Sequence, residues 1–179
     1  MFYLLHGSCY FTNVTFETII DNLTCGVNGY TDNTTSISSA SVTANQTYSI
    51  SVDLNGQGGT GYVGLWIDYD QNGIFDGNEY VYVGSTSLGT VTTNISVPFT
   101  ALGGNTRMRV KMETTWGTFI GLDPCYGNMY DGQTIDYSIN ITAGIPCTGT
   151  PNAGDATSSV STICENHPFT LDLINNDIV

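Results

Sequence analysis

Basic side chains are scarce in this sequence. Its 179 residues hold three Lys and Arg against 16 Asp and Glu, and the formal net charge is −13. Such a surface repels phosphate backbones, which argues against nucleic acid as a partner. It disfavours anionic membrane surfaces for the same reason. Divalent cations are the natural counter-ions for this charge balance.

Long apolar runs and closely spaced cysteine pairs are also missing. No stretch approaches the roughly 20 apolar residues of a membrane span, so we expect no membrane insertion. The apolar residues 1–6 lack the basic region and cleavage site of a signal peptide. We therefore expect a strand or a trimmed edge there, and a mature form or fragment of a secreted protein.

Five cysteines are present, and none forms the CxxC pair of a structural zinc or thioredoxin-type site. Wide spacing in an extracellular chain favours disulfides. We expect Cys25 to pair with Cys125 and Cys147 with Cys164. The odd count leaves Cys9 without a partner in this sequence.

Alternating apolar and polar residues dominate the middle of the chain, which is rich in Thr, Ser, Asn, Gly and Tyr. This period of two predicts half-buried strands over 48–54, 91–97, 106–112 and 133–141, and a more apolar central strand over 62–67. We expect an all-β fold, an antiparallel β-sandwich of the jelly-roll or immunoglobulin-like kind with long loops. Such a composition suits an extracellular, cell-surface protein.

The domain organisation follows from the end of the last alternating strand. Residues 1–142 are expected to form the sandwich and residues 143–146 a linker. Residues 147–179 are too few for their own core. We expect them to begin a second β module or to pack on the main domain, on a neighbouring molecule or on a continuation of the chain.

One stretch between two predicted strands has the spacing of a calcium loop. Oxygen-bearing side chains stand at the first, third, fifth, ninth and twelfth positions, a backbone carbonyl serves the seventh, and Gly73 occupies the sixth. Because strands flank the loop, it predicts a static Ca²⁺ site and not an EF-hand. The predicted ligands are Asp68, Asp70, Asn72, Ile74, Asp76 and Glu79.

A second interpretation competes with calcium. Asp and Asn side chains also cap their own backbone in ordinary turns, so part of the pattern is expected without any ion. Five ligand-type residues at the right spacing favour the metal. We expect the ion to be structural, fixing the turn between two core strands, and a calcium-bridged glycan is a secondary possibility.

Several ordered blocks over about residues 9–142 resemble the GEVED domain family of secreted bacterial proteins. The blocks are Gly29-Tyr30-Thr31-Asp32, Trp66 to Phe75 with Glu79, Val97-Pro98, Ala101, Thr106-Arg107-Met108-Arg109-Val110, Pro124-Cys125 and Gly132-Gln133-Thr134-Ile135-Asp136-Tyr137. The resemblance implies a non-catalytic β-sandwich accessory module of large surface proteins, adhesins and multidomain proteases. Residues 147–154 likewise resemble the start of an immunoglobulin-like module.

The chain departs from the family's naming motif at two positions. Gln133 and Ile135 stand where the family carries glutamates. If those glutamates approach the metal, this site has fewer charges and binds calcium more weakly, or uses Asp136 alone.

Other chemistry is less well supported by the sequence. Neither HExxH nor GxSxG is present, and no pair of acids stands out as catalytic, so we expect no enzyme. The basic residues Arg107, Arg109 and Lys111 of strand 106–112 share one face. This predicts a solvated face that guards an edge and balances local acids or, alternatively, a stripe for acidic or glycan ligands. Trp116, Tyr126 and Tyr130 in a Gly-rich segment are candidates for stacking on sugars.

Two functions remain open from the sequence. The first is a calcium-stabilised structural or adhesion module of a bacterial surface protein or filament, with fibre formation by strand addition through residues 147–179. The second is a carbohydrate-binding accessory module of a secreted hydrolase or protease. The expected partners are neighbouring domains, copies of the chain itself or a glycan.

Overall fold

The computed structural model describes residues 10–23, 29–55, 59–115, 121–125, 132–145, 153–159, 162 and 168–176. These residues form strands joined by turns, with one short 3-10 helix, η1 (Gly77–Glu79), so the predicted all-β class is confirmed. Among them no helix is long and apolar enough to cross a membrane. The chain divides into two compact units, Met1–Gly144 and Ile145–Val179.

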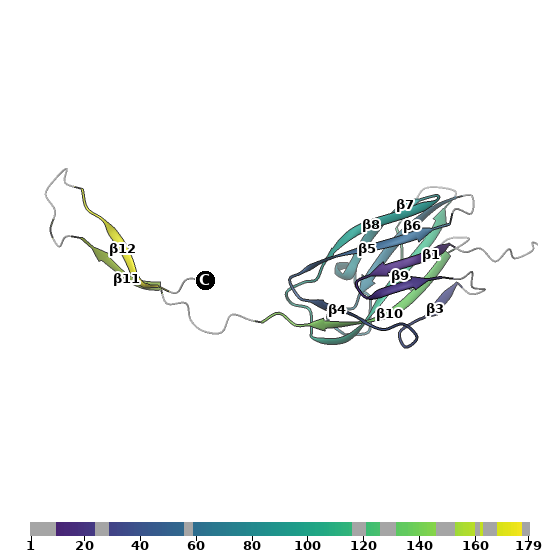
Figure 1. Cartoon of the computed structure of the whole chain (residues 1–179), viewed down its shortest axis with the longest axis horizontal. Coiled ribbons are helices and arrows are strands. Elements are labelled where there is room, and N and C mark those ends of the chain that lie inside the picture. The colour runs from purple at the N-terminus through teal and green to yellow at the C-terminus, as the bar shows by residue number, and fades with distance from the viewer. Residues whose placement is uncertain are drawn as a thin grey trace, which may run out of the picture. The chain divides into compact units, whose positions relative to one another are not determined.

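The first unit contains a four-stranded antiparallel sheet (Figure 1). The strand order is β2-β1-β5-β8. Its strands are β1 (Phe11–Phe16), β2 (Ile19–Asn22), β5 (Thr47–Leu54) and β8 (Gly89–Ser96).

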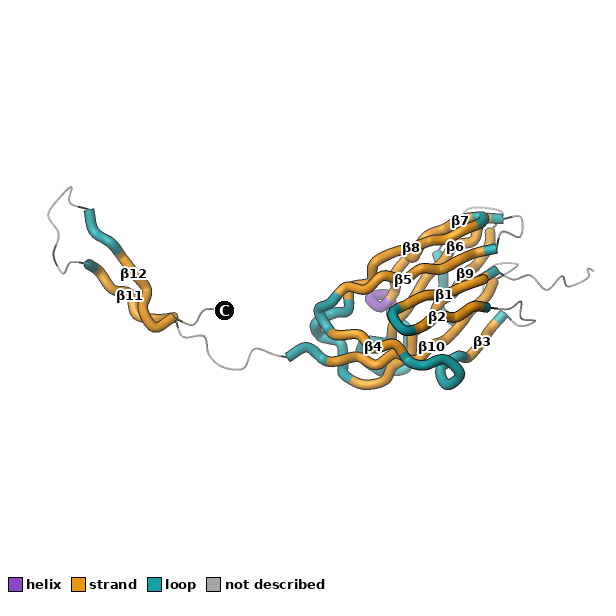
Figure 2. The backbone as a smooth tube through the Cα atoms, viewed as in Figure 1, coloured by secondary structure: helices purple, strands orange, loops and turns teal. Residues whose placement is uncertain are grey.

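The second sheet of this unit has six strands and lies against the first as the other layer of a sandwich (Figure 2). The order is β3-β10-β9-β6-β7, and β4 also pairs with β10. The strands are β3 (Tyr30–Asp32), β4 (Ala40–Thr43), β6 (Thr60–Ile67), β7 (Tyr80–Thr86), β9 (Gly104–Thr115) and β10 (Gly132–Thr142).

The pairing is not antiparallel throughout. β3 and β4 both run parallel to β10, with Tyr30 opposite Thr134 and Ala40 opposite Ile139. Both strands are short and lie about a hundred residues before β10, so no local turn determines their direction. The predicted sandwich is therefore confirmed, with a mixed six-stranded sheet.

The core lies between the two sheets and is made by alternate residues of each strand. Ile50, Val52 and Leu54 of β5 point inward with 0–4% of their surface exposed. Val63, Leu65 and Ile67 of β6 are all fully buried opposite them. This is the period-two burial expected when one sheet face packs on another.

The second unit contains an antiparallel pair, β11 (Ala153–Ser158) and β12 (Leu171–Asn176), with Asp155 opposite Ile174. Three large apolar side chains near this pair, Phe169, Leu171 and Ile174, are about half exposed or more. A two-stranded pair is marginally stable alone in water. This unit therefore has apolar surface available for packing on another β element.

Candidate metal centre

The predicted calcium loop joins β6 to β7 and is anchored at its first residue. Asp68 directly follows the buried end of β6. Its backbone N–H donates to the Arg107 carbonyl at 3.1 Å, and the Thr106 hydroxyl donates to the Asp68 carbonyl at 2.6 Å. Strand β9 thus holds the start of the loop against the sheet.

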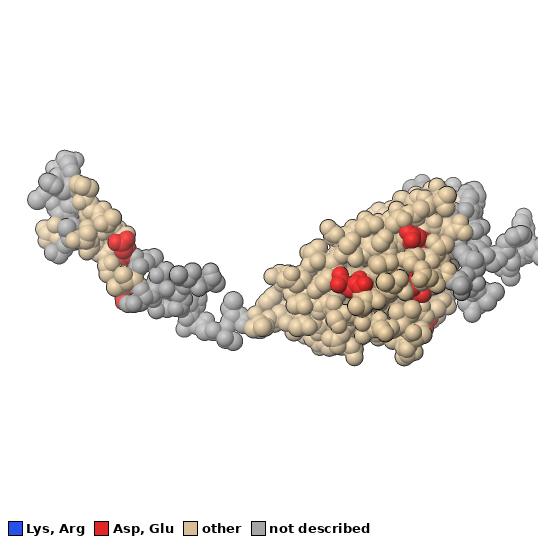
Figure 3. Space-filling model, in the orientation of Figure 1, with Lys and Arg blue, Asp and Glu red and all other residues tan. Residues whose placement is uncertain are grey.

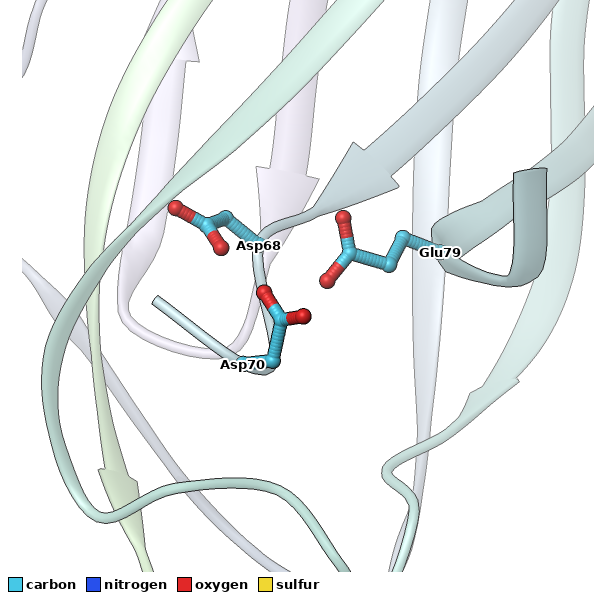
Figure 4. Close-up of side chains that lie close together, drawn as sticks. All are labelled: Asp68, Asp70 and Glu79. Carbon is cyan, nitrogen blue, oxygen red and sulfur yellow. The ribbon is translucent and has the colours of Figure 1, made fainter. Parts of the chain in front are cut away.

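Three carboxylates of the loop come together in space. One oxygen from each of Asp68, Asp70 and Glu79 lies within 4.8 Å of the other two. Figure 4 shows Glu79 extending from η1 towards the two aspartates at the end of β6. Calcium binds oxygens at about 2.3–2.6 Å, so oxygens on opposite sides of one ion are about 5 Å apart. The spacing therefore allows one ion to contact all three groups.

Two of these carboxylates are buried, which is costly for charged groups. Asp68 is 7% exposed and Glu79 is 2% exposed. Both accept backbone hydrogen bonds, Glu79 from Tyr69 at 2.7 Å and Asp76 at 3.0 Å. Asp68 accepts from Asn72 at 3.1 Å and Gly73 at 3.0 Å. Each carboxylate oxygen can accept more than one bond, so these contacts do not exhaust the ligand capacity of either group.

Burial raises the pKa of Glu79 above its ordinary value, and the negative charge of Asp68 raises it further. Backbone hydrogen bonds from Asp76, Tyr69 and Asp70 act in the opposite direction. A divalent cation between the carboxylates would favour their ionised forms. Glu79 is therefore the loop residue whose ionisation depends most clearly on what occupies this space.

The remaining predicted ligands lie around this cluster without all joining it. The Asn72 amide donates to Asp70 at 3.0 Å and to Asp76 at 3.3 Å. Its own oxygen accepts from Ile74 N–H at 2.7 Å. Asp76 forms a capping box with Glu79 around η1. The role of the Ile74 carbonyl stays a prediction, and its side chain is exposed.

Both interpretations of the loop have support in these contacts. The Asn72 N–H donates to the Asp70 side chain and the Ile74 N–H to the Asn72 side chain. These are the bonds expected if Asp and Asn only cap their own backbone in ordinary turns. Gly73 has φ +81°, as the sharp turn of a calcium loop requires. Turn chemistry alone does not require three carboxylates within 4.8 Å of one another, and this convergence is the part of the pattern that the calcium interpretation predicts.

No Lys or Arg of this chain neutralises the carboxylate cluster. All three basic side chains are described, and their carboxylate partners lie elsewhere. Arg107 and Arg109 pair with Asp136, and Lys111 pairs with Glu113. The cluster therefore has hard oxygen donors and lacks a basic partner in the described part of the chain, which fits a Ca²⁺ ion.

The basic face of β9 balances local acids as the sequence predicts, but it does not lie at an edge and is not solvated at Arg109 and Lys111. β9 is a central strand, and the side chains of Arg109 and Lys111 are only 13% and 6% exposed. Residues 121–125 cross over them, with Arg109 donating to the Pro124 carbonyl and Lys111 to the Asp123 carbonyl. Residues 121–125 shield both cations, and each cation is paired with an acid, as a buried charge requires.

The naming-motif positions lie away from the loop carboxylates. Asp136 is fully buried and accepts a bidentate pair of bonds from Arg109 at 2.6 and 2.7 Å. Ile135 points into the core, and the Gln133 side chain accepts from Phe11 N–H at 3.1 Å. Asp136 is therefore a partner of Arg109, and Gln133 joins the two sheets.

Two aromatic residues near this ion pair were not singled out as functional from the sequence. The Arg109 guanidinium lies over the ring of Phe75 at 5.0 Å and that of Tyr30 at 5.7 Å. Tyr30 also donates to Asp136 at 3.0 Å. Both residues stand in blocks that resemble the GEVED family, and Phe75 also lies within the acidic loop.

Trp116, Tyr126 and Tyr130 lie outside the described residues, as do Cys9, Cys25, Cys147 and Cys164. Cys125 is described, and it is exposed and free. The predicted Cys25–Cys125 disulfide is therefore not confirmed, and the predicted Cys147–Cys164 disulfide stays a prediction.

Comparison with known proteins supports the resemblance noted from the sequence. No curated protein matches this chain. A family model matches the part of the chain from β6 to β10. This part includes the carboxylate loop, the paired basic residues of β9 and the naming-motif positions. Residues 62–140 match the GEVED domain, which confirms the expected family resemblance for this part of the chain.

Proposed function

We propose that the first unit is a non-catalytic, calcium-stabilised structural or adhesion module of a bacterial surface protein or filament, acting outside the cell. One observation carries the proposal. Two buried carboxylates, Asp68 and Glu79, meet the exposed Asp70 where two strands of a core sheet are joined. A bound Ca²⁺ would neutralise them and supply only positive charge and coordination.

The protein's own residues explain how such an ion would stabilise the fold. Asp68 is attached to β9 through Thr106, and Glu79 ends the helical turn that leads into β7. Ligands from both ends of the loop would connect β6, β7 and β9 through one ion. Since static Ca²⁺ sites of this kind occur in extracellular modules, this arrangement also favours the proposed location.

The buried acids outside the loop have structural partners, which supports the non-catalytic part of the proposal. Asp136 and Glu113 pair with basic residues. Asp21 accepts hydrogen bonds from Tyr137 at 2.9 Å and from Asn33 at 2.7 Å. Burial and the proximity of Asp21 raise the pKa of Tyr137 far above its ordinary value, which keeps that hydroxyl a neutral donor.

The second unit is proposed to complete another β element. Exposed apolar residues beside β11 and β12 favour packing on a further module, such as the immunoglobulin-like one that the sequence resembles, or on a neighbouring copy by strand addition. Sedimentation of the chain with and without residues 147–179 tests the fibre version. Assembly that requires the tail supports it, and a monomer at all concentrations contradicts it.

A carbohydrate-binding accessory module is the second candidate. Tyr30 and Tyr82, 47% and 43% exposed, lie on strands at the two sides of the six-stranded sheet and provide exposed rings. A glycan array tests it, with Tyr82→Ala as the variant on the described sheet and Trp116→Ala, Tyr126→Ala and Tyr130→Ala at the residues predicted from the sequence. Absence of binding to any sugar removes this candidate.

Equilibrium unfolding in Ca²⁺ and in EDTA tests the first candidate. Calcium at a hundred times its dissociation constant would add about 2.7 kcal/mol to the free energy of unfolding. Magnesium at the same concentration is the control cation, because it accepts this flexible, low-symmetry set of ligands less well. Identical unfolding curves in Ca²⁺ and EDTA would contradict the structural role.

A further inference from the structure

A polar hollow lies beside the carboxylate loop on the outer side of the six-stranded sheet. It has a volume of about 390 Å³, within the range of small-ligand sites. A smaller hollow of about 230 Å³ continues from it and shares Asn105, Thr106 and Arg107. The larger hollow is also lined by Asp68, Gln71, Gly73 and Phe75, and the smaller one by Thr34 and Ser138.

Arg107 supplies the positive charge in the lining of this hollow. Its side chain is 52% exposed, whereas those of Arg109 and Lys111 are 13% and 6% exposed. It is therefore the one Lys or Arg in the chain with a mostly exposed side chain. The face shown in Figure 3 carries Asp and Glu and displays no Lys or Arg among its described residues. Among the described residues, the mostly exposed Lys or Arg side chain is that of Arg107, which lines this hollow.

Arg107 has two acidic neighbours, Asp136 and, by its electrostatic effect, Asp32. Its Nη1 lies 3.7 Å from Asp136 Oδ2, which is longer than a hydrogen bond. That carboxylate already accepts from Arg109 at 2.6 and 2.7 Å and from Tyr30 at 3.0 Å. Arg107 therefore presents a planar set of donors suited to a ligand carboxylate.

The rest of the lining suits hydroxyl groups. Thr34, Ser138, Asn105 and Gln71 provide hydroxyls and amides, and the partly buried Phe75 adds an aromatic ring. Two of these groups are held in place, because Asn140 donates to Asn105 at 2.9 Å and Gln71 donates to the Leu102 carbonyl at 3.0 Å. Fixed polar groups with an aromatic wall match a sugar better than an extended peptide.

We propose that this hollow binds an acidic saccharide through its carboxylate, with Arg107 as the residue that selects uronic acids over neutral sugars. The proposal rests on the proposed calcium site, because Asp68, one of the predicted calcium ligands, lines the same hollow. A Ca²⁺ ion bound at that carboxylate would reduce the repulsion of an anionic ligand. Calcium and saccharide are therefore expected to strengthen each other's binding.

Calorimetry with a short probe tests the assignment. The intact protein is titrated with trigalacturonate and with its methyl ester, each in Ca²⁺ and in EDTA. The acid is expected to bind at least about tenfold more tightly than the ester in Ca²⁺, since a charge-assisted pair is lost in the ester. Equal affinity for acid and ester, or no binding of either, would overturn the proposal.

Three variants separate recognition from folding. Arg107→Gln is expected to weaken binding of the acid by about tenfold or more and leave that of the ester unchanged. Arg107→Lys should bind with intermediate affinity, because charge remains and the planar fork is lost. Thr92→Ala, at an exposed position of the four-stranded sheet, is the matched control and should bind normally. Unchanged binding in Arg107→Gln would reject Arg107 as the selecting residue.

A separate calcium titration distinguishes the two proposals. Calcium binding without binding of the acid removes the saccharide site and leaves the calcium module intact. Binding of the acid that depends on Arg107 but not on Ca²⁺, in a protein that binds no calcium, removes the calcium module and the expected coupling and keeps Arg107 as the selecting residue.

Discussion

Phe75 of the carboxylate loop lies against Arg109 of β9, with the guanidinium carbon 5.0 Å from the centre of the ring. This contact joins the candidate metal centre to the buried ion pair of Arg109 with Asp136. Arg109 also donates to the carbonyl of Pro124 in the segment that covers β9. The carboxylate loop and residues 121–125 therefore both contact the Arg109 side chain.

Removal of the Phe75 ring should destabilise this connection. Phe75→Ala removes apolar cover from Arg109 and a cation–π contact of about 0.5–2 kcal/mol. We expect a total loss of about 1–3 kcal/mol in the free energy of unfolding, measured by urea denaturation. Phe75→Leu keeps much of the apolar cover and should lose less. Equal losses in both variants would show that the aromatic ring makes no specific contribution.

Breaking the Arg109–Asp136 ion pair should lower the free energy of unfolding more than removing the Phe75 ring does. Asp136 is fully buried, so Arg109→Met leaves a carboxylate with Tyr30 and the distant Arg107 as its partners. The expected loss is about 3–5 kcal/mol. The double variant Arg109→Met with Asp136→Asn removes the uncompensated charge and should recover part of that loss. If the double variant is no more stable than Arg109→Met, the charge is not what destabilises the single variant.

The contact between the two sheets gives a third prediction. Gln133→Leu removes the acceptor for the buried Phe11 N–H and should lower the free energy of unfolding by about 1–3 kcal/mol. Gln133→Glu keeps an oxygen acceptor at the position where the family carries glutamate. In urea denaturation, a Leu variant as stable as the wild type would mean that the bond contributes nothing measurable.

The strands that carry their own pattern could be predicted from the sequence. Alternation over 48–54 and 133–141 predicts strands that the structure confirms as β5 and β10. The loop from Asp68 to Glu79 was predicted for a similar reason, because its spacing is local. Three of its predicted ligands lie close together, and their binding of an ion stays a prediction.

Features that depend on distant segments could not be predicted. Alternation places Arg109 and Lys111 on one face of β9, but it does not reveal that residues 121–125 cover that face. The parallel pairing of Tyr30 with Thr134 likewise joins segments about a hundred residues apart. Sequence patterns determine which residues share a face, whereas tertiary contacts determine what covers it.

The raised pKa of Glu79 gives a prediction about pH. Burial and the charge of Asp68 raise the pKa above the ordinary value of 4.5, so the folded state binds this proton more tightly than the unfolded state. The resulting stability is present below pH 4.5 and is lost as pH rises through the folded pKa. In EDTA, Glu79→Gln should remove this part of the pH dependence in urea unfolding, and identical profiles for variant and wild type would contradict it.

Calcium should reverse the direction of that pH effect. Because protons compete with the metal for carboxylates, calcium affinity is expected to rise with pH through the same window. Stability in Ca²⁺ should then increase with pH relative to stability in EDTA. A gap between the two conditions that does not change with pH would exclude Glu79 as a ligand that titrates in this range.

The most direct measurement is calorimetric titration of the protein with Ca²⁺. We predict one ion per chain, with binding lost in Glu79→Ala and strongly weakened in Asp70→Asn. Asp32→Asn is the matched control, because Asp32 is also exposed and accepts bonds from the residue two positions later, yet it stands outside the cluster. No heat of binding at millimolar Ca²⁺, or equal weakening by Asp32→Asn and Asp70→Asn, would contradict the calcium site.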